Sequence, residues 1–155
     1  MTLQDLGSIG EIVGAVGVIL SLVYLTVQIR QNTRSVRSAS LQEAMRDVFS
    51  ITDSLSTDHE LSRLYWKGLA DFDSLDPDER RRFSAYLVGL FRRFENIFYQ
   101  TRHGALEADF WEGVRKTAVL TIGRPGAAAW WRDASDLFSE EFCEYVEHEL
   151  LGGGR

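Results

Sequence analysis

The stretch IGEIVGAVGVILSLVYLTVQI, residues 9–29, decides the fold of this chain, because it carries no charge after Glu11. A helix rises about 1.5 Å per residue, so the stretch makes a helix of roughly 31 Å, which matches a hydrocarbon layer of about 30 Å. We therefore expect a membrane-spanning helix. Its glycines, with Ser21, Tyr24 and Thr26, make it less apolar than many spans, so a buried core helix of a soluble protein stays open as the alternative.

The positive charges of the chain are unevenly distributed. All 17 Lys and Arg residues lie at or after Arg30, and Arg30, Arg34 and Arg37 follow the apolar stretch directly. By the positive-inside rule, this distribution predicts an N-terminus outside the membrane and a cytoplasmic C-terminal part. A cleaved signal peptide is disfavoured, because such a peptide has a basic start and a small-residue cleavage site, and neither is present.

The composition is that of a folded protein, with 155 residues, 45% of them apolar and 26% charged. We divide the chain into a membrane-spanning helix over residues 1–30, a cytoplasmic helical domain over 31–151 and a flexible tail over 152–155. The net charge of -6 argues against a nucleic-acid binder, which presents a concentrated basic surface. The single cysteine, Cys143, excludes an intrachain disulfide framework.

Helical spacing and capping signals predict an all-α fold, in which a long N-terminal helix continues into a small bundle of about five further helices. Asp58 and Asp76 are candidate N-caps, and Pro77 and Glu79 complete a capping-box signal after Asp76. No stretch alternates with period two for long enough to make a strand. The predicted helices cover residues 8–55, 59–70, 77–103, 107–122, a short segment that carries Trp130 and Trp131, and 139–151.

The helix over residues 77–103 is expected to be the central element of the soluble domain. Two charged residues, Arg93 and Glu95, flank its apolar stripe, so we expect these charges to be solvated or paired across helices. A polar functional site between helices, built on Arg93 and Glu95, is the alternative. The apolar stripe consists of Phe83, Leu87, Leu90, Phe94 and Ile97.

Small and polar residues repeat in steps of three and four along one face of the first helix. Small residues at this spacing let two helices approach closely in lipid, and a strict seven-residue repeat favours a left-handed crossing. We therefore expect self-association, or docking on a partner's membrane helix, through this face. The face, which we call the glycine seam, consists of Gly7, Gly10, Gly14, Gly17, Ser21, Tyr24 and Gln28, and the same steps continue through Gln31, Ser35, Ser38 and Gln42.

No motif indicates catalysis, cofactor binding or metal binding. The chain has no G-x-S-x-G elbow and no phosphate-binding glycine loop. Glu144 and His148 lie one turn apart, but a ferritin-like metal site needs several inward Glu and paired Glu-x-x-His motifs. We therefore expect no cofactor and no metal, and we favour a protein that is not an enzyme.

Four segments carry a resemblance to a known family: LVYLTVQIRQNTRSVRSAS (residues 22–40), FRRFENIFYQ (91–100), GALEADFW (104–111) and the Trp130-Trp131 pair. In these segments the chain resembles a widespread family of uncharacterised small bacterial proteins. Its members are helical and are described as having one N-terminal membrane span. The resemblance implies a bacterial origin and the architecture argued above, and it implies no activity and no binding residue.

Three functional hypotheses follow from these observations. The first is a single-pass inner-membrane protein whose cytoplasmic helical domain is an interaction or assembly module. Its partners would be the lipid bilayer and either a second copy or a partner membrane helix. The second is an oligomeric pore with Gln28, Gln31 and Ser35 near its cytoplasmic mouth. The third is a small membrane-tethered enzyme or ligand sensor with a pocket between the soluble helices.

Overall fold

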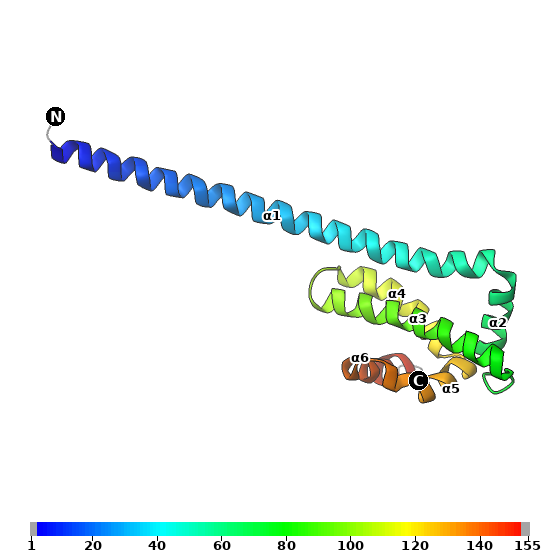
Figure 1. Cartoon of the computed structure of the whole chain (residues 1–155). Coiled ribbons are helices and arrows are strands. Elements are labelled where there is room, and N and C mark those ends of the chain that lie inside the picture. The colour runs from blue at the N-terminus through cyan, green and yellow to red at the C-terminus, as the bar shows by residue number, and fades with distance from the viewer. Residues whose placement is uncertain (1–2, 153–155) are drawn as a thin grey trace. The chain divides into compact units, whose positions relative to one another are not determined.

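A computed structural model describes the backbone of residues 3–152 and the side-chain surroundings of residues 14–152. Within that part the chain is all-α and contains no strand, which confirms the predicted fold class (Figure 1). A long helix precedes five shorter ones, as the sequence predicts. The elements are α1 (Leu3–Thr57), α2 (His59–Ala70), α3 (Pro77–Arg102), α4 (Ala108–Ile122), α5 (Pro125–Ala134), the 3-10 turn η1 (Ser135–Leu137), α6 (Glu140–Tyr145) and the π-helical turn η2 (Val146–Leu151).

The chain divides into two compact units, residues 1–39 and residues 40–155. The first unit is the N-terminal part of α1, and its described residues, 14–39, are all exposed. The second unit contains the C-terminal part of α1 and the helices α2 to α6, which share one hydrophobic core. Of the predicted tail, residues 153–155 lie outside the described residues.

The capping residues lie where the sequence predicts them. Asp58 accepts hydrogen bonds from the backbone N–H groups at the start of α2, at 3.0 and 2.9 Å. Asp76 does the same for α3 at 2.8 and 2.9 Å, and Glu79 accepts from the Asp76 backbone at 3.1 Å, which completes the capping box. Gly104, with φ +71, follows the C-terminus of α3 in the left-handed conformation that glycine adopts without strain.

Helix α3 is the central element of the second unit, and its predicted apolar stripe is buried. The residues Phe83, Leu87, Leu90, Phe94 and Ile97 are each at most 2% exposed. The side chains of Trp130 and Trp131 complete the core from α5, because their rings lie 5.4 and 5.3 Å from the ring of Phe91. Aromatic packing therefore joins α3 to the elements that follow it in sequence.

Helices α2 and α5 cross at two glycines. A Cβ atom added at Gly126 would lie 1.8 Å from the carbonyl oxygen of Gly68, which is closer than any real contact allows. A Cβ added at Gly68 would lie 2.4 Å from the ring of Phe83. The backbone of α5 therefore touches that of α2 at Gly126, where only glycine fits, and the Phe83 ring of α3 restricts position 68 to glycine.

Candidate membrane helix and polar sites of the helical domain

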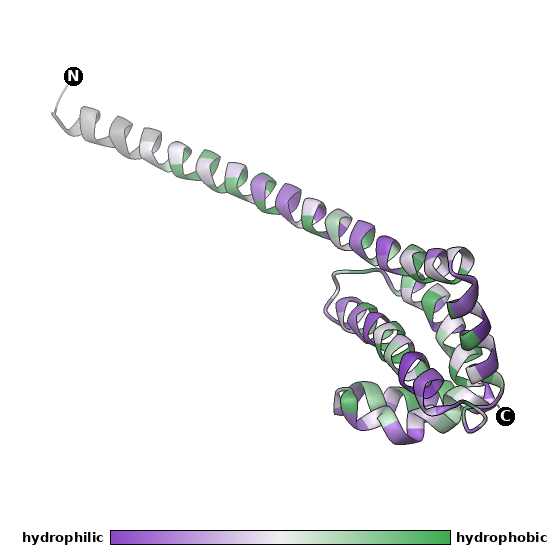
Figure 2. Ribbon diagram, turned by 45° about the vertical axis from the view of Figure 1, so that its right-hand side comes forward, coloured by the Kyte–Doolittle hydropathy of each residue, from purple (hydrophilic) through white to green (hydrophobic). Residues whose placement is uncertain are grey.

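The apolar segment of α1 is exposed on all sides. Within the described residues α1 is the one helix long and apolar enough to cross a membrane, and none of the residues in its apolar window is buried. Figure 2 colours each residue by hydropathy and shows the hydrophobic residues of this helix in green. A helix that is hydrophobic all round needs a covering of core, lipid or another chain. Its large apolar side chains are between 47% and 64% exposed: Val16, Val18, Ile19, Leu20, Leu22, Val23, Tyr24, Leu25, Val27 and Ile29.

The polar side chains of this segment find their hydrogen-bond partners inside the helix. The hydroxyl of Ser21 donates to the carbonyl oxygen of Gly17 at 2.9 Å, and that of Thr26 donates to the carbonyl of Leu22 at 2.8 Å. The side-chain amide of Gln28 donates to the hydroxyl of Tyr24 at 2.7 Å. Hydrogen bonds of Ser21 and Thr26 to carbonyl groups of their own helix lower the cost of placing these two hydroxyls in a hydrocarbon environment.

The glycine seam faces no other part of the chain where it is described. A Cβ atom at Gly14 or Gly17 would meet no heavy atom within 4 Å, so no contact inside the chain requires glycine there. The seam residues Ser21, Tyr24 and Gln28 are also exposed. The predicted seam residues Gly7 and Gly10 lie outside the residues whose surroundings the structure describes.

In the second unit, Glu95 is a buried carboxylate, only 7% exposed, that joins α3 to the start of α6. Its Oε1 atom accepts hydrogen bonds from the backbone N–H of Ser139 at 2.9 Å and from the hydroxyl of Ser139 at 2.7 Å. Its Oε2 atom pairs with Arg92 at 2.7 Å. The hydroxyl of Tyr99 lies 2.8 Å from the Ser139 hydroxyl and extends the network. Both carboxylate oxygens are thus occupied by groups of this chain.

The surroundings of Glu95 favour its charged form. Burial acts to raise the pKa of Glu95, but the hydrogen bonds from Ser139 and Arg92 outweigh it and hold this pKa below its ordinary value. A general acid or base needs a pKa near the working pH and a free atom that faces substrate. Glu95 has neither property, so its arrangement is that of a structural contact.

The structure does not join the predicted pair Arg93 and Glu95. Arg93 is half-buried, and its charge acts on Tyr86, whose pKa burial nevertheless raises to about 12. The partner of Glu95 is Arg92, one residue before. The three-residue spacing from Arg92 to Glu95 on a helix could have predicted this pair, whereas no local pattern indicated Ser139.

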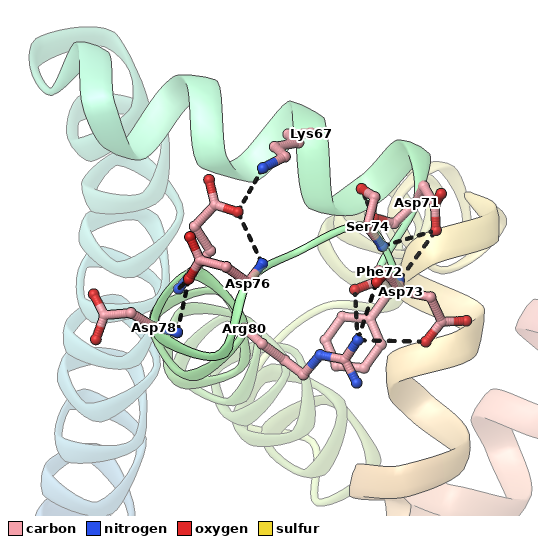
Figure 3. A network of polar contacts seen from close by, with 9 residues as sticks. Lys67, Asp71, Phe72, Asp73, Ser74, Asp76, Asp78 and Arg80 are labelled. Carbon is pink, nitrogen blue, oxygen red and sulfur yellow. Dashed lines mark hydrogen bonds and ion pairs between the residues drawn. The ribbon is translucent and has the colours of Figure 1, made fainter.

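A second polar network holds the turn between α2 and α3 (Figure 3). Lys67 pairs with Glu79 at 2.5 Å, and the hydrogen bond from Lys67 lowers the pKa of Glu79. The guanidinium of Arg80 lies 4.7 Å from the ring centroid of Phe72 and donates to the Phe72 carbonyl at 3.4 Å. Since the capping carboxylate of Glu79 and the guanidinium of Arg80 both bind neighbours in this turn, the network fixes the entry into α3.

The helical domain has surface grooves but no cluster of metal-binding side chains among its described residues. A groove of about 570 Å³ lies between α4 and η2 and is lined by Arg115, Lys116, Val119, Leu120, Glu149 and Leu150. A smaller groove of about 220 Å³ beside α2 and α3 is lined mostly by charged residues. The smaller groove is lined by Glu60, Arg63, Leu64, Lys67, Glu79 and Arg82.

Comparisons of the chain with protein-family models, with curated proteins and with solved structures found no match. The residues and contacts described above therefore carry the functional argument.

Proposed function

We propose that this chain is a membrane-anchored helical interaction module that self-associates through the glycine seam. The exposed apolar surface of residues 14–29 carries the proposal, because these side chains are uncovered in the part of the chain that the structure describes. Residues 9–29 span the bilayer, the N-terminus lies outside and the helical domain lies in the cytoplasm. The resemblance to small bacterial membrane proteins favours the inner membrane of a bacterium.

The residues after the apolar segment support this orientation. Arg30, Arg34 and Arg37 are all exposed and lie where the helix would leave the hydrocarbon on the cytoplasmic side. Anionic lipids of the inner leaflet attract such juxtamembrane cations by about 1 kcal/mol each. Tyr24 lies between one and two turns before Arg30, near the proposed cytoplasmic surface of the membrane. Tyrosine is common at this boundary between lipid and water, where its ring contacts the apolar layer. The hydroxyl of Tyr24 accepts a hydrogen bond from Gln28.

Self-association is supported by the open surface of the glycine seam. In lipid no hydrophobic force drives two helices together, so association depends on close packing of small residues. Gly14 and Gly17 provide such a surface, and no atom of this chain occupies it. A second helix could approach these two positions without displacing any side chain.

The polar contacts of the helical domain favour an interaction module over an enzyme. Glu95 is the buried carboxylate of the domain's described part, and groups of the chain itself occupy both of its oxygens. Glu79 and Arg80 hold the turn before α3. These charges stabilise the fold, and Glu79, which lines the groove of about 220 Å³, is paired there with Lys67.

Replacing Gly14 with Ile tests the self-association. The substitution puts a branched side chain into the glycine seam, so we expect the oligomer to dissociate towards monomer in mild detergent, as measured by light scattering of the eluted protein. Ala15→Ile is the matched control, because it adds the same side chain one residue away and off the seam, and it should leave the mass unchanged. An identical oligomeric mass for wild type and Gly14→Ile would refute the seam as the homomeric contact.

A further inference from the structure

The C-terminal part of α1, residues 40–57, has one apolar face that is covered and, next to it, an uncharged face that is exposed and carries Met45 and Phe49. Ala44 is fully buried, and Val48, Ile51 and Leu55 pack against the core of the second unit. The adjacent face, displaced by one residue, is exposed throughout. We call it the Phe49 face, and it consists of Gln42, Met45, Phe49, Thr52 and Ser56.

The Phe49 face has the form of a contact surface. Phe49 is 65% exposed and Met45 is 41% exposed, and the two lie one turn apart on the same face. A groove of about 460 Å³ adjoins Phe49. A projecting side chain beside a groove is the arrangement by which helices interlock in coiled coils. The groove is lined by Arg46, Phe49, Ser50, Thr52, Asp53 and Ser56.

The charge pattern of α1 indicates which partner fits this face. The residues of the glycine seam and of the Phe49 face belong to one series in the sequence, in which successive members are three or four residues apart. Gln31, Ser35 and Ser38 connect the two parts of this series. No residue on these steps from Gly14 to Ser56 carries a charge. The charges of the same stretch fall between the steps, at Arg30, Arg34, Arg37, Glu43, Arg46, Asp47 and Asp53.

A charge-free face is what a second copy of the same helix requires. When two identical helices lie parallel and in register, each position on the shared face meets its own copy, so a charge there would face the same charge. A partner of different sequence could supply the opposite charge, so a charge on its contact face could be paired, which an identical copy in register cannot do. The pattern therefore favours a second copy of this chain over an unrelated protein.

We propose that the Phe49 face is a cytoplasmic contact between two copies of this chain, parallel and in register. The direction rests on the proposed function, because two copies anchored in one membrane by residues 9–29 have their α1 helices pointing the same way. Met45, Phe49 and Thr52 of one copy then pack against the same residues of the other. The contact extends self-association from the membrane segment into the helical domain.

Cysteine cross-linking tests the contact and its direction. In full-length protein carrying Cys143→Ser, single cysteines are placed by Met45→Cys, by Thr52→Cys and, on a neighbouring exposed face, by Glu43→Cys, and the membranes are then oxidised. We expect disulfide-linked dimers for Met45→Cys and Thr52→Cys and little for Glu43→Cys. If the two helices were antiparallel and crossed at Phe49, position 45 of one copy would lie far from position 45 of the other, and the same would hold for position 52. Loss of both cross-links, or equal cross-linking at all three sites, would overturn the proposal.

A charged substitution on the Phe49 face gives a second test, which measures the oligomeric mass and needs no change at Cys143. Phe49→Glu alters an exposed residue, so the core stays intact, but it sets two carboxylates against each other in the pair. We expect the oligomeric mass in detergent to fall. Leu120→Glu is the matched control, since Leu120 is 70% exposed on α4 and away from this face, and it should behave as wild type. An unchanged mass for Phe49→Glu would count against the contact.

The two proposals fail separately. If Gly14→Ile dissociates the oligomer while Met45→Cys and Thr52→Cys give no cross-link, the Phe49 face is wrong and the glycine seam stands. If both cysteines cross-link while Gly14→Ile leaves the oligomer unchanged, the glycine seam is wrong and the Phe49 face stands.

Discussion

At the scale of single residues, Glu95 shows how a buried charge is kept in a helical core. Burying a carboxylate is costly unless donors replace the water it loses. Two donors of Ser139 and one of Arg92 do so, at 2.7 to 2.9 Å. The carboxylate thereby holds Ser139, the N-cap residue that precedes α6, against the middle of α3.

Glu95→Gln should destabilise the protein without changing its fold. The neutral amide accepts hydrogen bonds less strongly and sets an N–H against one of the donors, so we expect a loss of about 1–3 kcal/mol in the free energy of unfolding. Thermal unfolding followed by circular dichroism measures it. Glu112→Gln is the control, because exposed Glu112 pairs with Arg115 on the same helix. Similar losses in the two variants would contradict the role given to Glu95.

The lowered pKa of Glu95 predicts how this difference depends on pH. Since the folded state holds this carboxyl in its charged form, its contribution to stability is present above the unfolded-state pKa, near 4.5, and is lost as the pH falls through the folded-state pKa. Wild type and Glu95→Gln should therefore differ in melting temperature at pH 7 and converge below pH 4.5. A constant difference down to acid pH would show that the charge of Glu95 is not the cause.

At the scale of elements, the sequence predicts those features of a helix that depend on residues close together in the chain. The apolar spacing of α3 and the Asp76–Glu79 capping box lie within a few residues of each other, and both are confirmed. The sequence indicated that Glu95 could be paired across helices but named no partner, because Ser139 is 44 residues away in sequence and only tertiary packing brings it near. The α2–α5 crossing was missed for the same reason, since nothing adjacent to Gly126 indicates contact with Gly68.

The crossing of α2 and α5 yields a prediction at this scale. Gly126→Ala places a methyl group against the Gly68 carbonyl, so the helices must separate, and we expect a loss of about 1–3 kcal/mol or more in unfolding free energy. Gly89→Ala in α3 is the control, because a Cβ there meets no atom within 4 Å. It should gain roughly 0.5–1 kcal/mol from the better helix propensity of Ala. Chemical denaturation of both variants measures the difference, and a stable Gly126→Ala protein would contradict direct backbone contact.

At the scale of the whole molecule, the sequence predicts a membrane helix over residues 1–30 and a helical domain after it, and the chain divides into compact units between residues 39 and 40. The apolar residues 14–29 are exposed in the described part of the chain, so we expect their stability in the cell to depend on what surrounds the chain. Contacts inside the helical domain determine the core around α3, and the helical spacing of its apolar residues was enough to predict that core. The proposed membrane anchor rests on the charge and hydropathy of the sequence.

Membrane fractionation tests the anchor, the central claim of this account, most directly. The full chain and a version that begins at Gln31, which keeps all of the second unit, are expressed and washed with alkaline carbonate. We predict that the full chain stays in the membrane pellet and that the shorter version is released. Release of the full chain into the soluble fraction would contradict the anchor, and the exposed segment would then be a surface that another protein chain covers.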